Sequence, residues 1–305
     1  MSSTPRHAPI GRYAPSPTGD LHLGNLRTAL LAHDDIRSRG GTFILRIEDT
    51  DTPRNVPGSE ARIIEDLAWL GITWDEGPDV GGPAGPYRQS ERREIYMSAL
   101  HQLIDRGLIY LCRCSRKDLQ SAASAPHGSE GPVYTGVCRS TIGEHAAITK
   151  AAQDLLHSPG RDHGYALRLR TDQMDQVEFT DELHGFRRFN PADAGDFVVL
   201  RRDGLWAYQF VCAVDDALMG VTRVVRGEDL LSSTPRQVAI IKTLGFIPPV
   251  YRHVPLVADA TGTRLSKRLR ANGLATLKQQ GLTGDKAREF ILSAQICQPL
   301  SLDKF

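Results

Sequence analysis

The spacing of apolar residues near the start of the chain predicts a buried strand between two helices. The strand is the run Phe43–Ile47, which follows two glycines and precedes an acidic turn. Apolar residues recur at helical spacing over residues 24–39 before the strand. They do so again over residues 59–70 after it, where Gly71 provides a stop. This alternation predicts an α/β fold in which helices cover a parallel sheet.

The pattern changes twice along the rest of the chain. A predicted helix at 90–106 is followed by short strands, a small-residue loop and three of the five cysteines. Strand signals resume at 197–201 and 221–225, and further helices are predicted at 232–244 and 283–294. We interpret the chain as the first half of an α/β domain (1–109), an insertion (110–191), the second half of that domain (192–258) and a basic loop with a helical C-terminal region (259–305).

Charge narrows the function classes. The 305 residues include 37 Lys and Arg against 36 Asp and Glu, and this net charge of +1 excludes a generally basic nucleic-acid coat. The charge is uneven, since residues 34–79 carry 11 acidic and 5 basic residues and residues 262–289 carry 7 basic and 2 acidic. No apolar run is typical of a signal peptide or a membrane helix. We expect a cytoplasmic monomer without a membrane partner.

The stretch from Arg12 to Asn25 is the most informative in the chain. It reads Arg-Tyr-Ala-Pro-Ser-Pro-Thr-Gly-Asp-Leu-His-Leu-Gly-Asn, and a helix is predicted to begin near Gly24. A loop before a helix N-terminus favours an anion, because free N–H groups and the helix dipole point at it. His22 adds a donor for a phosphate. From spacing alone, an ordinary Pro/Gly turn with a surface histidine remains an alternative.

This stretch resembles the first signature ("HIGH") of class I aminoacyl-tRNA synthetases in its glutamate-branch form, with Asn25 in place of the second histidine. Arg264–Arg268 resembles the second signature, the "KMSKS" loop. The resemblance implies a Rossmann-type catalytic domain that uses ATP with Mg²⁺. It also implies that His22 and Lys267 are catalytic and stabilise charge that develops on the phosphates. The ATP-binding residues that it implies are His22, Gly24, Asn25, Ser266 and Lys267.

A pocket for glutamate needs an arginine for the side-chain carboxylate, a carboxylate near the ammonium group and further polar donors. Glu48 follows the first predicted strand, and ligands of parallel sheets bind outside the carboxyl ends of strands. Read singly, Tyr208 is also compatible with a core residue and Arg226 with a structural ion pair. The resemblance implies a glutamate pocket formed by Arg12, Tyr13, Ala14, Pro15, Ser16, Glu48, Tyr208 and Arg226.

Three cysteines suggest a metal site. Cys112 and Cys114 are one residue apart and Cys138 follows 24 residues later, which suits a zinc site that needs a fourth ligand. Chemistry alone favours a histidine, His127 or His145, and burial of the cysteines as plain apolar residues is the alternative. The resemblance favours Tyr134, because short glutamate-type synthetases carry Cys-x-Cys with Tyr-x-x-x-Cys. We expect one structural Zn²⁺ per chain.

The resemblance covers about residues 10 to 290. The chain length and the Cys-x-Cys…Tyr-x-x-x-Cys pattern are similar to those of the glutamyl-queuosine tRNA(Asp) synthetases, which lack an anticodon-binding domain. The resemblance implies activation of L-glutamate and its transfer to the queuosine base at the wobble position of tRNA(Asp). Three alternatives stay open: a short glutamyl-tRNA synthetase that charges tRNA(Glu), an inactive glutamate- or zinc-binding paralogue, and an unrelated nucleotidyltransferase.

Overall fold

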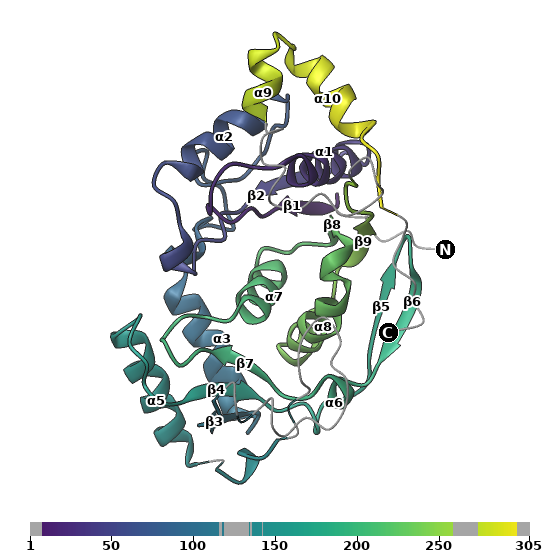
Figure 1. Cartoon of the computed structure of the whole chain (residues 1–305). Helices are drawn as coiled ribbons and strands as arrows, with labels where there is room; N and C mark the ends of the chain where they lie inside the picture. Colours follow the sequence, from purple (N-terminus) through teal and green to yellow (C-terminus); the bar gives the residue numbers. More distant parts are fainter. Residues whose placement is uncertain are drawn as a thin grey trace.

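A six-stranded sheet forms the centre of the protein (Figure 1). The computed structural model describes residues 8–115, 118, 134, 136–141, 143–258 and 274–297. The strand order is β2-β1-β8-β9-β5-β6, and every pair is parallel except β5 with β6. The strands are β1 (Ile10–Tyr13), β2 (Thr42–Leu45), β5 (Val177–Asp181), β6 (Gly185–Phe189), β8 (Arg223–Gly227) and β9 (Val250–Val254).

Helices cover both faces of this sheet because its strands are apolar on both sides. Phe43 and Leu45 of β2 pack in one cluster with α1, α2, α9 and α10, whereas Ile44 packs in another with Val238 of α8. Near-continuous apolar runs are the pattern of parallel strands buried on both faces. The helices on the two faces are α1 (Leu23–Arg37), α2 (Ser59–Trp69), α7 (Tyr208–Leu218), α8 (Thr234–Thr243), α9 (Leu274–Gln279) and α10 (Gly284–Leu292).

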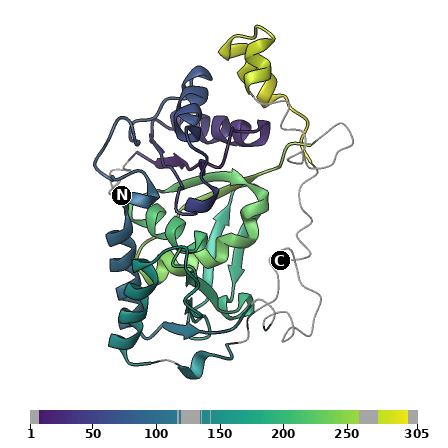
Figure 2. The same ribbon diagram turned by 60° about the vertical axis from the view of Figure 1, so that its left-hand side comes forward.

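A second, antiparallel sheet of order β3-β4-β7 lies at the end of the molecule opposite α9 and α10 (Figures 1 and 2). Its strands are β3 (Ile109–Cys112), β4 (Ala166–Leu169) and β7 (Phe197–Leu200). The helices in this region are α3 (Arg93–Asp105), α5 (His145–His157) and the short α6 (Pro191–Ala194). Four 3-10 turns complete the described structure, η1 (Thr52–Arg54), η2 (Gln89–Glu91), η3 (Arg139–Thr141) and η4 (Glu228–Ser233).

The two sheets are interleaved along the chain. The hairpin β5–β6 lies between β4 and β7 in sequence, yet it extends the central sheet. The α/β fold with helices on both faces is confirmed, but the sheet is not wholly parallel, because a connection as short as residues 182–184 can only join antiparallel strands. The four-part division of the chain stays a prediction. In the part of the chain that is described, no helix is long and apolar enough to span a bilayer.

Gly11 allows α1 to lie directly on β1. A Cβ at this position would stand 2.3 Å from Cγ1 and 2.6 Å from Cδ1 of Ile36, a fully buried side chain on α1. Such distances are far below van der Waals contact, so a side chain at residue 11 would force Ile36 or the helix to shift. Because β1 ends in the loop that leads back to α1, this close packing also fixes the position of that loop.

We therefore expect Gly11→Ala to lower the free energy of unfolding by about 1–3 kcal/mol through overpacking. Ile36→Ala removes both clashing carbons, so the double variant should be less destabilised than the sum of the two single variants. Urea unfolding of the four proteins in this double-mutant cycle measures the coupling. Additive losses would contradict direct packing of Gly11 against Ile36.

Candidate active site

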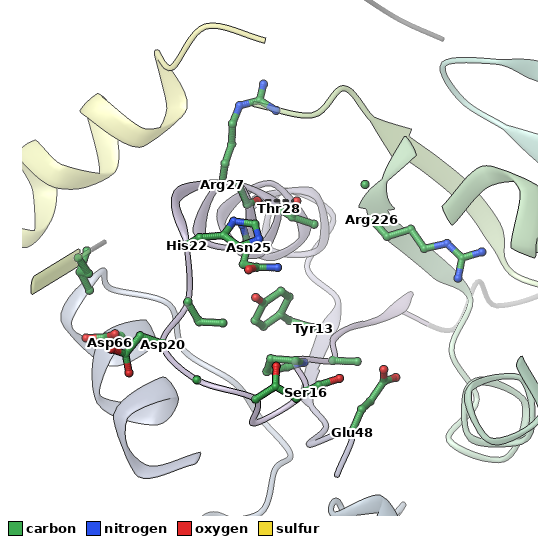
Figure 3. Close-up of a pocket in the computed structure, with 18 of the residues that line it drawn as sticks. Tyr13, Ser16, Asp20, His22, Asn25, Arg27, Thr28, Glu48, Asp66 and Arg226 are labelled. Carbon is green, nitrogen blue, oxygen red and sulfur yellow. Dashed lines mark hydrogen bonds between the residues drawn. The ribbon is translucent and has the colours of Figure 1, made fainter. Parts of the chain in front are cut away.

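A cavity of about 1280 Å³ opens beyond the carboxyl ends of β1, β2 and β8 (Figure 3). It brings together every site residue expected from the sequence that the structure describes, apart from the separate cysteine group. These lining residues are Arg12, Tyr13, Ala14, Pro15, Ser16, His22, Gly24, Asn25, Glu48, Tyr208 and Arg226. Ser266 and Lys267 lie outside the described residues.

His22 stands at the start of α1, where the loop after β1 ends. As the residue that caps the helix, it accepts a hydrogen bond on Nδ1 from the backbone N–H of Asn25 at 3.2 Å. A nitrogen that accepts carries no proton, so the neutral ring holds its proton on Nε2. Gly24 completes this geometry, because a Cβ there would stand 3.1 Å from Cε1 of His22. The loop thus presents an imidazole donor beside a helix N-terminus, which suits a phosphate.

Two adjacent aspartates on α7 hold Arg12, which lines the cavity, together with Arg46 and Arg92, which lie behind it. Asp216 accepts hydrogen bonds from Nε of Arg12 at 3.1 Å and from Nη1 of Arg46 at 2.8 Å. Asp215 accepts from Nε of Arg92 at 2.7 Å and from the hydroxyl of Tyr96 at 2.9 Å. All six side chains are buried, so this network replaces the water that the charges lose.

The charges in this network shift one another's titration. Burial alone would raise the pKa of Asp216, but the positive charges of Arg12 and Arg46 outweigh burial and lower that pKa. Burial likewise opposes the charge on Arg12, yet Asp216 raises the pKa of Arg12 above its usual value. For Asp215, burial is the larger effect and raises the pKa in spite of Arg46 and Arg92. Asp216 is therefore an ionised carboxylate that Arg12 and Arg46 share.

Arg46 links this network to Glu48. The two residues follow β2 with one residue between them, and Nη2 of Arg46 donates to Oε1 of Glu48 at 3.0 Å. The thiol of Cys212, one turn after Tyr208 on α7, donates to the same oxygen at 3.1 Å. Glu48 is thus fixed at the cavity edge as a carboxylate that can meet a cationic group.

Arg226 has a different environment from the three arginines that pair with the aspartates of α7. It ends the buried part of β8 on the side of the cavity away from His22 (Figure 3). Nε donates to Nε2 of His253 at 2.9 Å, Nη1 to Oε1 of Gln237 at 2.7 Å and Nη2 to Oγ1 of Thr234 at 2.8 Å. Among the described residues, no carboxylate pairs with Arg226. The structural ion pair considered from the sequence is therefore not found.

Tyr208 is not a core residue, since 39% of its surface is exposed and it lines the cavity from the first turn of α7.

Groups of opposite charge and hydrogen-bond donors surround the cavity. Glu48, Ser16 and Arg226 lie at one end, His22 and Asn25 beside the middle, and Asp20 with Asp66 at the other end (Figure 3). Such a cavity can bind a zwitterionic small molecule at one end and phosphates beside α1.

The sulfurs of Cys112, Cys114 and Cys138 gather beside β3, all within 4.8 Å of one another. The hydroxyl of Tyr134 lies 3.6 Å from Sγ of Cys112 and 3.8 Å from Sγ of Cys114. Tetrahedral Zn–S bonds of about 2.3 Å need sulfurs nearly 4 Å apart, so this group fits zinc. His145 instead pairs with Asp105 at 2.7 Å, and His127 lies outside the described residues.

A family model described as class I tRNA synthetases (E and Q), catalytic domain, matches residues 10–296. The chain belongs to this family. A relative from Symbiobacterium thermophilum, named glutamyl-Q tRNA(Asp) synthetase, is 50% identical over 274 residues, which cover 89% of this chain and 81% of the relative. The resemblance expected from the sequence is confirmed, and this class I synthetase is a ligase of the aminoacyl-tRNA synthetase type.

Glutamate–tRNA ligases are similar over part of their length. That of Sulfurihydrogenibium sp. is 42% identical over 92% of this chain but only 57% of the relative. The crystal structure of glutamate–tRNA synthetase from Elizabethkingia anophelis superposes with a TM-score of 0.71 at 35% identity, over 86% of this chain and 53% of that one. The synthetase chain thus spans about half the length of these ligases. Family membership implies glutamate, ATP with Mg²⁺ and tRNA as substrates.

Sequence reasoning missed the residues behind the cavity wall. Asp215 and Asp216 sit in an apolar helical run, and this is the one signal that could have drawn attention to them, because paired acids in such a run must find cations. The spacing of two residues places Arg46 and Glu48 on the same side of the extended segment that follows β2. His253 gives no sequence signal, since its partners come from β5, β8 and α8.

Asp216→Asn should lower the free energy of unfolding by about 3–5 kcal/mol, because it leaves Arg12 buried without its ion-pair partner and removes one of the carboxylates that pair with Arg46. Since the pKa of Asp216 is lowered in the folded state, its stabilisation is present at neutral pH. The difference in free energy of unfolding between this variant and the unmodified protein should therefore narrow as the pH falls below about 4. Urea unfolding across pH measures both effects.

Asp154→Asn is the matched control, because Asp154 pairs with Lys150 on the exposed face of α5. It should cost less than about 1 kcal/mol. Equal losses for the two variants would mean that the buried network does not stabilise the fold.

Proposed function

We propose that this synthetase activates L-glutamate with ATP and transfers it to the queuosine base of tRNA(Asp). The observation that most supports glutamate is the charge pattern of the cavity. The buried Arg226 donates to described acceptors that are not carboxylates, so its positive charge favours an anionic ligand. Arg12, in contrast, is already paired with Asp216. A side-chain carboxylate at Arg226 and an ammonium group at Glu48 describe an acidic amino acid.

In the first step, the α-carboxylate of glutamate attacks the α-phosphorus of ATP, which gives glutamyl-adenylate and releases pyrophosphate. His22 would donate from Nε2 to a phosphate oxygen, in keeping with the tautomer that its contact with Asn25 sets. We assign Lys267 a second positive charge at the phosphates, and this role rests on its sequence motif alone. Mg²⁺ bound to ATP supplies counter-charge to the phosphates. Positioning of two bound substrates replaces any covalent enzyme intermediate.

In the second step, a hydroxyl of the queuosine cyclopentene ring attacks the mixed anhydride, forms the glutamyl ester and releases AMP. This acceptor is supported by the relative from Symbiobacterium thermophilum, whose name specifies a glutamyl-Q tRNA(Asp) synthetase and of which the chain covers 81%. A second such relative, from Nitratidesulfovibrio vulgaris, is 46% identical and is covered over 82% of its length. The competing acceptor is the 3′ end of tRNA(Glu).

Incubation with labelled glutamate, ATP and separate tRNAs distinguishes the acceptors. We expect label in tRNA(Asp) that contains queuosine, and background label in tRNA(Asp) without queuosine and in mature tRNA(Glu), since only the modified base offers the cyclopentene hydroxyl. Nuclease digestion should place the label on the anticodon loop. Label at the 3′ end of tRNA(Glu) would overturn the queuosine assignment, and failure of glutamate-dependent ATP–pyrophosphate exchange would overturn activation itself.

We further propose that Cys112, Cys114, Tyr134 and Cys138 hold one zinc ion with a structural role. Metal analysis of purified protein should give about one zinc per chain, and Cys138→Ala should abolish binding. Tyr134→Phe removes one of four ligands, so chelator competition should show zinc affinity at least about tenfold weaker. Cys297→Ser is the matched control outside the cluster and should bind normally. Unchanged affinity in Tyr134→Phe would exclude the tyrosine as a ligand.

A further inference from the structure

Arg226 is held by a chain of buried groups that extends away from the cavity. Its Nε donates to Nε2 of His253 at 2.9 Å, and His253 has no exposed surface. On the other side of the ring, Nδ1 of His253 lies 2.5 Å from Oδ2 of Asp181. The three residues come from β8, β9 and β5, three neighbouring strands of the central sheet. Asp181, His253 and Arg226 therefore form one continuous line of hydrogen bonds, which we term the relay.

Asp181 is fixed as an ionised carboxylate at the far end of the relay. Besides His253, it accepts hydrogen bonds from Nδ1 of His184 at 2.9 Å and from the backbone N–H groups of Leu183, His184 and His253 at 2.9 to 3.1 Å. Burial alone would raise the pKa of Asp181, but the bonds from His253 and His184 outweigh burial and lower it. An ionised carboxylate offers only acceptors, so both histidines must donate to it.

These neighbours fix the tautomer of His253. Nδ1 must carry a proton because it faces the carboxylate, and Nε2 must lack one because it accepts from the guanidinium of Arg226. Burial lowers the pKa of His253 to about 4, so the ring stays neutral at physiological pH. A neutral ring in this tautomer pins Arg226 without adding a second positive charge beside it.

We propose that Asp181 and His253 are positioning residues that aim Arg226 at the side-chain carboxylate of the amino acid and so set selectivity for glutamate. This inference rests on the proposed function of the cavity. An arginine side chain has many rotamers, and fixing it in advance removes an entropy cost from substrate binding. Gln237 and Thr234 hold the two Nη atoms, while the relay holds Nε and thereby the plane of the guanidinium.

Two substitutions of His253 separate the halves of the relay. Asn places its amide nitrogen near the position of Nδ1, which keeps the bond to Asp181 and removes the acceptor for Arg226. Gln places its oxygen near Nε2, which keeps the acceptor for Arg226 and loses the bond to Asp181. In ATP–pyrophosphate exchange, His253→Asn should raise the KM for glutamate roughly 10- to 100-fold, the range expected for one charged hydrogen bond. His253→Gln should raise it less, and neither should change the KM for ATP more than about twofold.

Asp181→Asn tests the tautomer directly. An asparagine amide can donate to Nδ1, which moves the ring proton to Nε2 and sets it against the N–H of Arg226. The KM for glutamate should then rise as in His253→Asn. Imidazole ¹⁵N NMR should show His253 protonated on Nδ1 in the unmodified protein and on Nε2 in this variant. A proton on Nε2 in the unmodified protein would overturn the relay without any activity measurement, even if the His253 variants fail to fold.

The controls distinguish failure of the relay from failure of the proposed pocket. His157→Asn, an exposed histidine at the end of α5, should leave both KM values unchanged. Arg226→Gln should raise the KM for glutamate whether or not the relay exists. If Arg226→Gln has no effect, the glutamate pocket is wrong. If Arg226→Gln raises the KM but His253→Asn does not, or if His253→Asn raises the KM values for glutamate and ATP equally, only the relay is wrong.

Discussion

The pairing of Asp215 and Asp216 with three buried arginines is the constraint on which the site depends. The arginines come from β1, from the segment after β2 and from the start of α3, while both aspartates belong to α7. A buried guanidinium without a counter-charge is strongly unfavourable, so these segments can close together only when α7 is in place. The same pairing, through Arg46, fixes Glu48 at the edge of the cavity. Stability of the fold and geometry of the site therefore have a common origin.

Two arginines at this cavity show how neighbours decide the role of one residue type. Arg12 is neutralised by Asp216 and serves to hold the cavity floor. Arg226 is equally buried, but it donates to an imidazole, an amide, a hydroxyl and a carbonyl, and its guanidinium lies 5.2 Å from the ring centre of Tyr251. These partners hold its geometry and supply no carboxylate. The difference follows from position, since Arg12 faces the acidic end of α7 and Arg226 faces the polar side of α8. Charge complementarity to a ligand thus depends on which arginine is left without a carboxylate.

Sequence reasoning found the elements whose pattern is local. The helices at Leu23–Arg37 and Ser59–Trp69 and the strand at Thr42–Leu45 follow apolar spacing and lie within a few residues of their predicted limits. It missed β1, because Ile-Gly-Arg-Tyr contains too few aliphatic residues, and α7, whose buried face includes two acids. The cavity residues were found through one motif and its resemblance to a family. The relay could not be predicted, since Asp181 and His253 are 72 residues apart and meet only through strand order.

The surroundings of the cysteine cluster argue that a metal there would stabilise the second sheet and take no part in the chemistry. Asp196, just before β7, accepts hydrogen bonds from Tyr110 of β3 at 2.5 Å and from Arg139, next to Cys138, at 2.7 Å. Arg168 of β4 lies over the ring of Tyr134 at 4.1 Å. These contacts join all three strands of the sheet to the cluster, whereas none of its cysteines lines the cavity. Loss of the metal should therefore loosen this sheet first and affect the cavity only indirectly, through α3 and through the contact of β7 with α7.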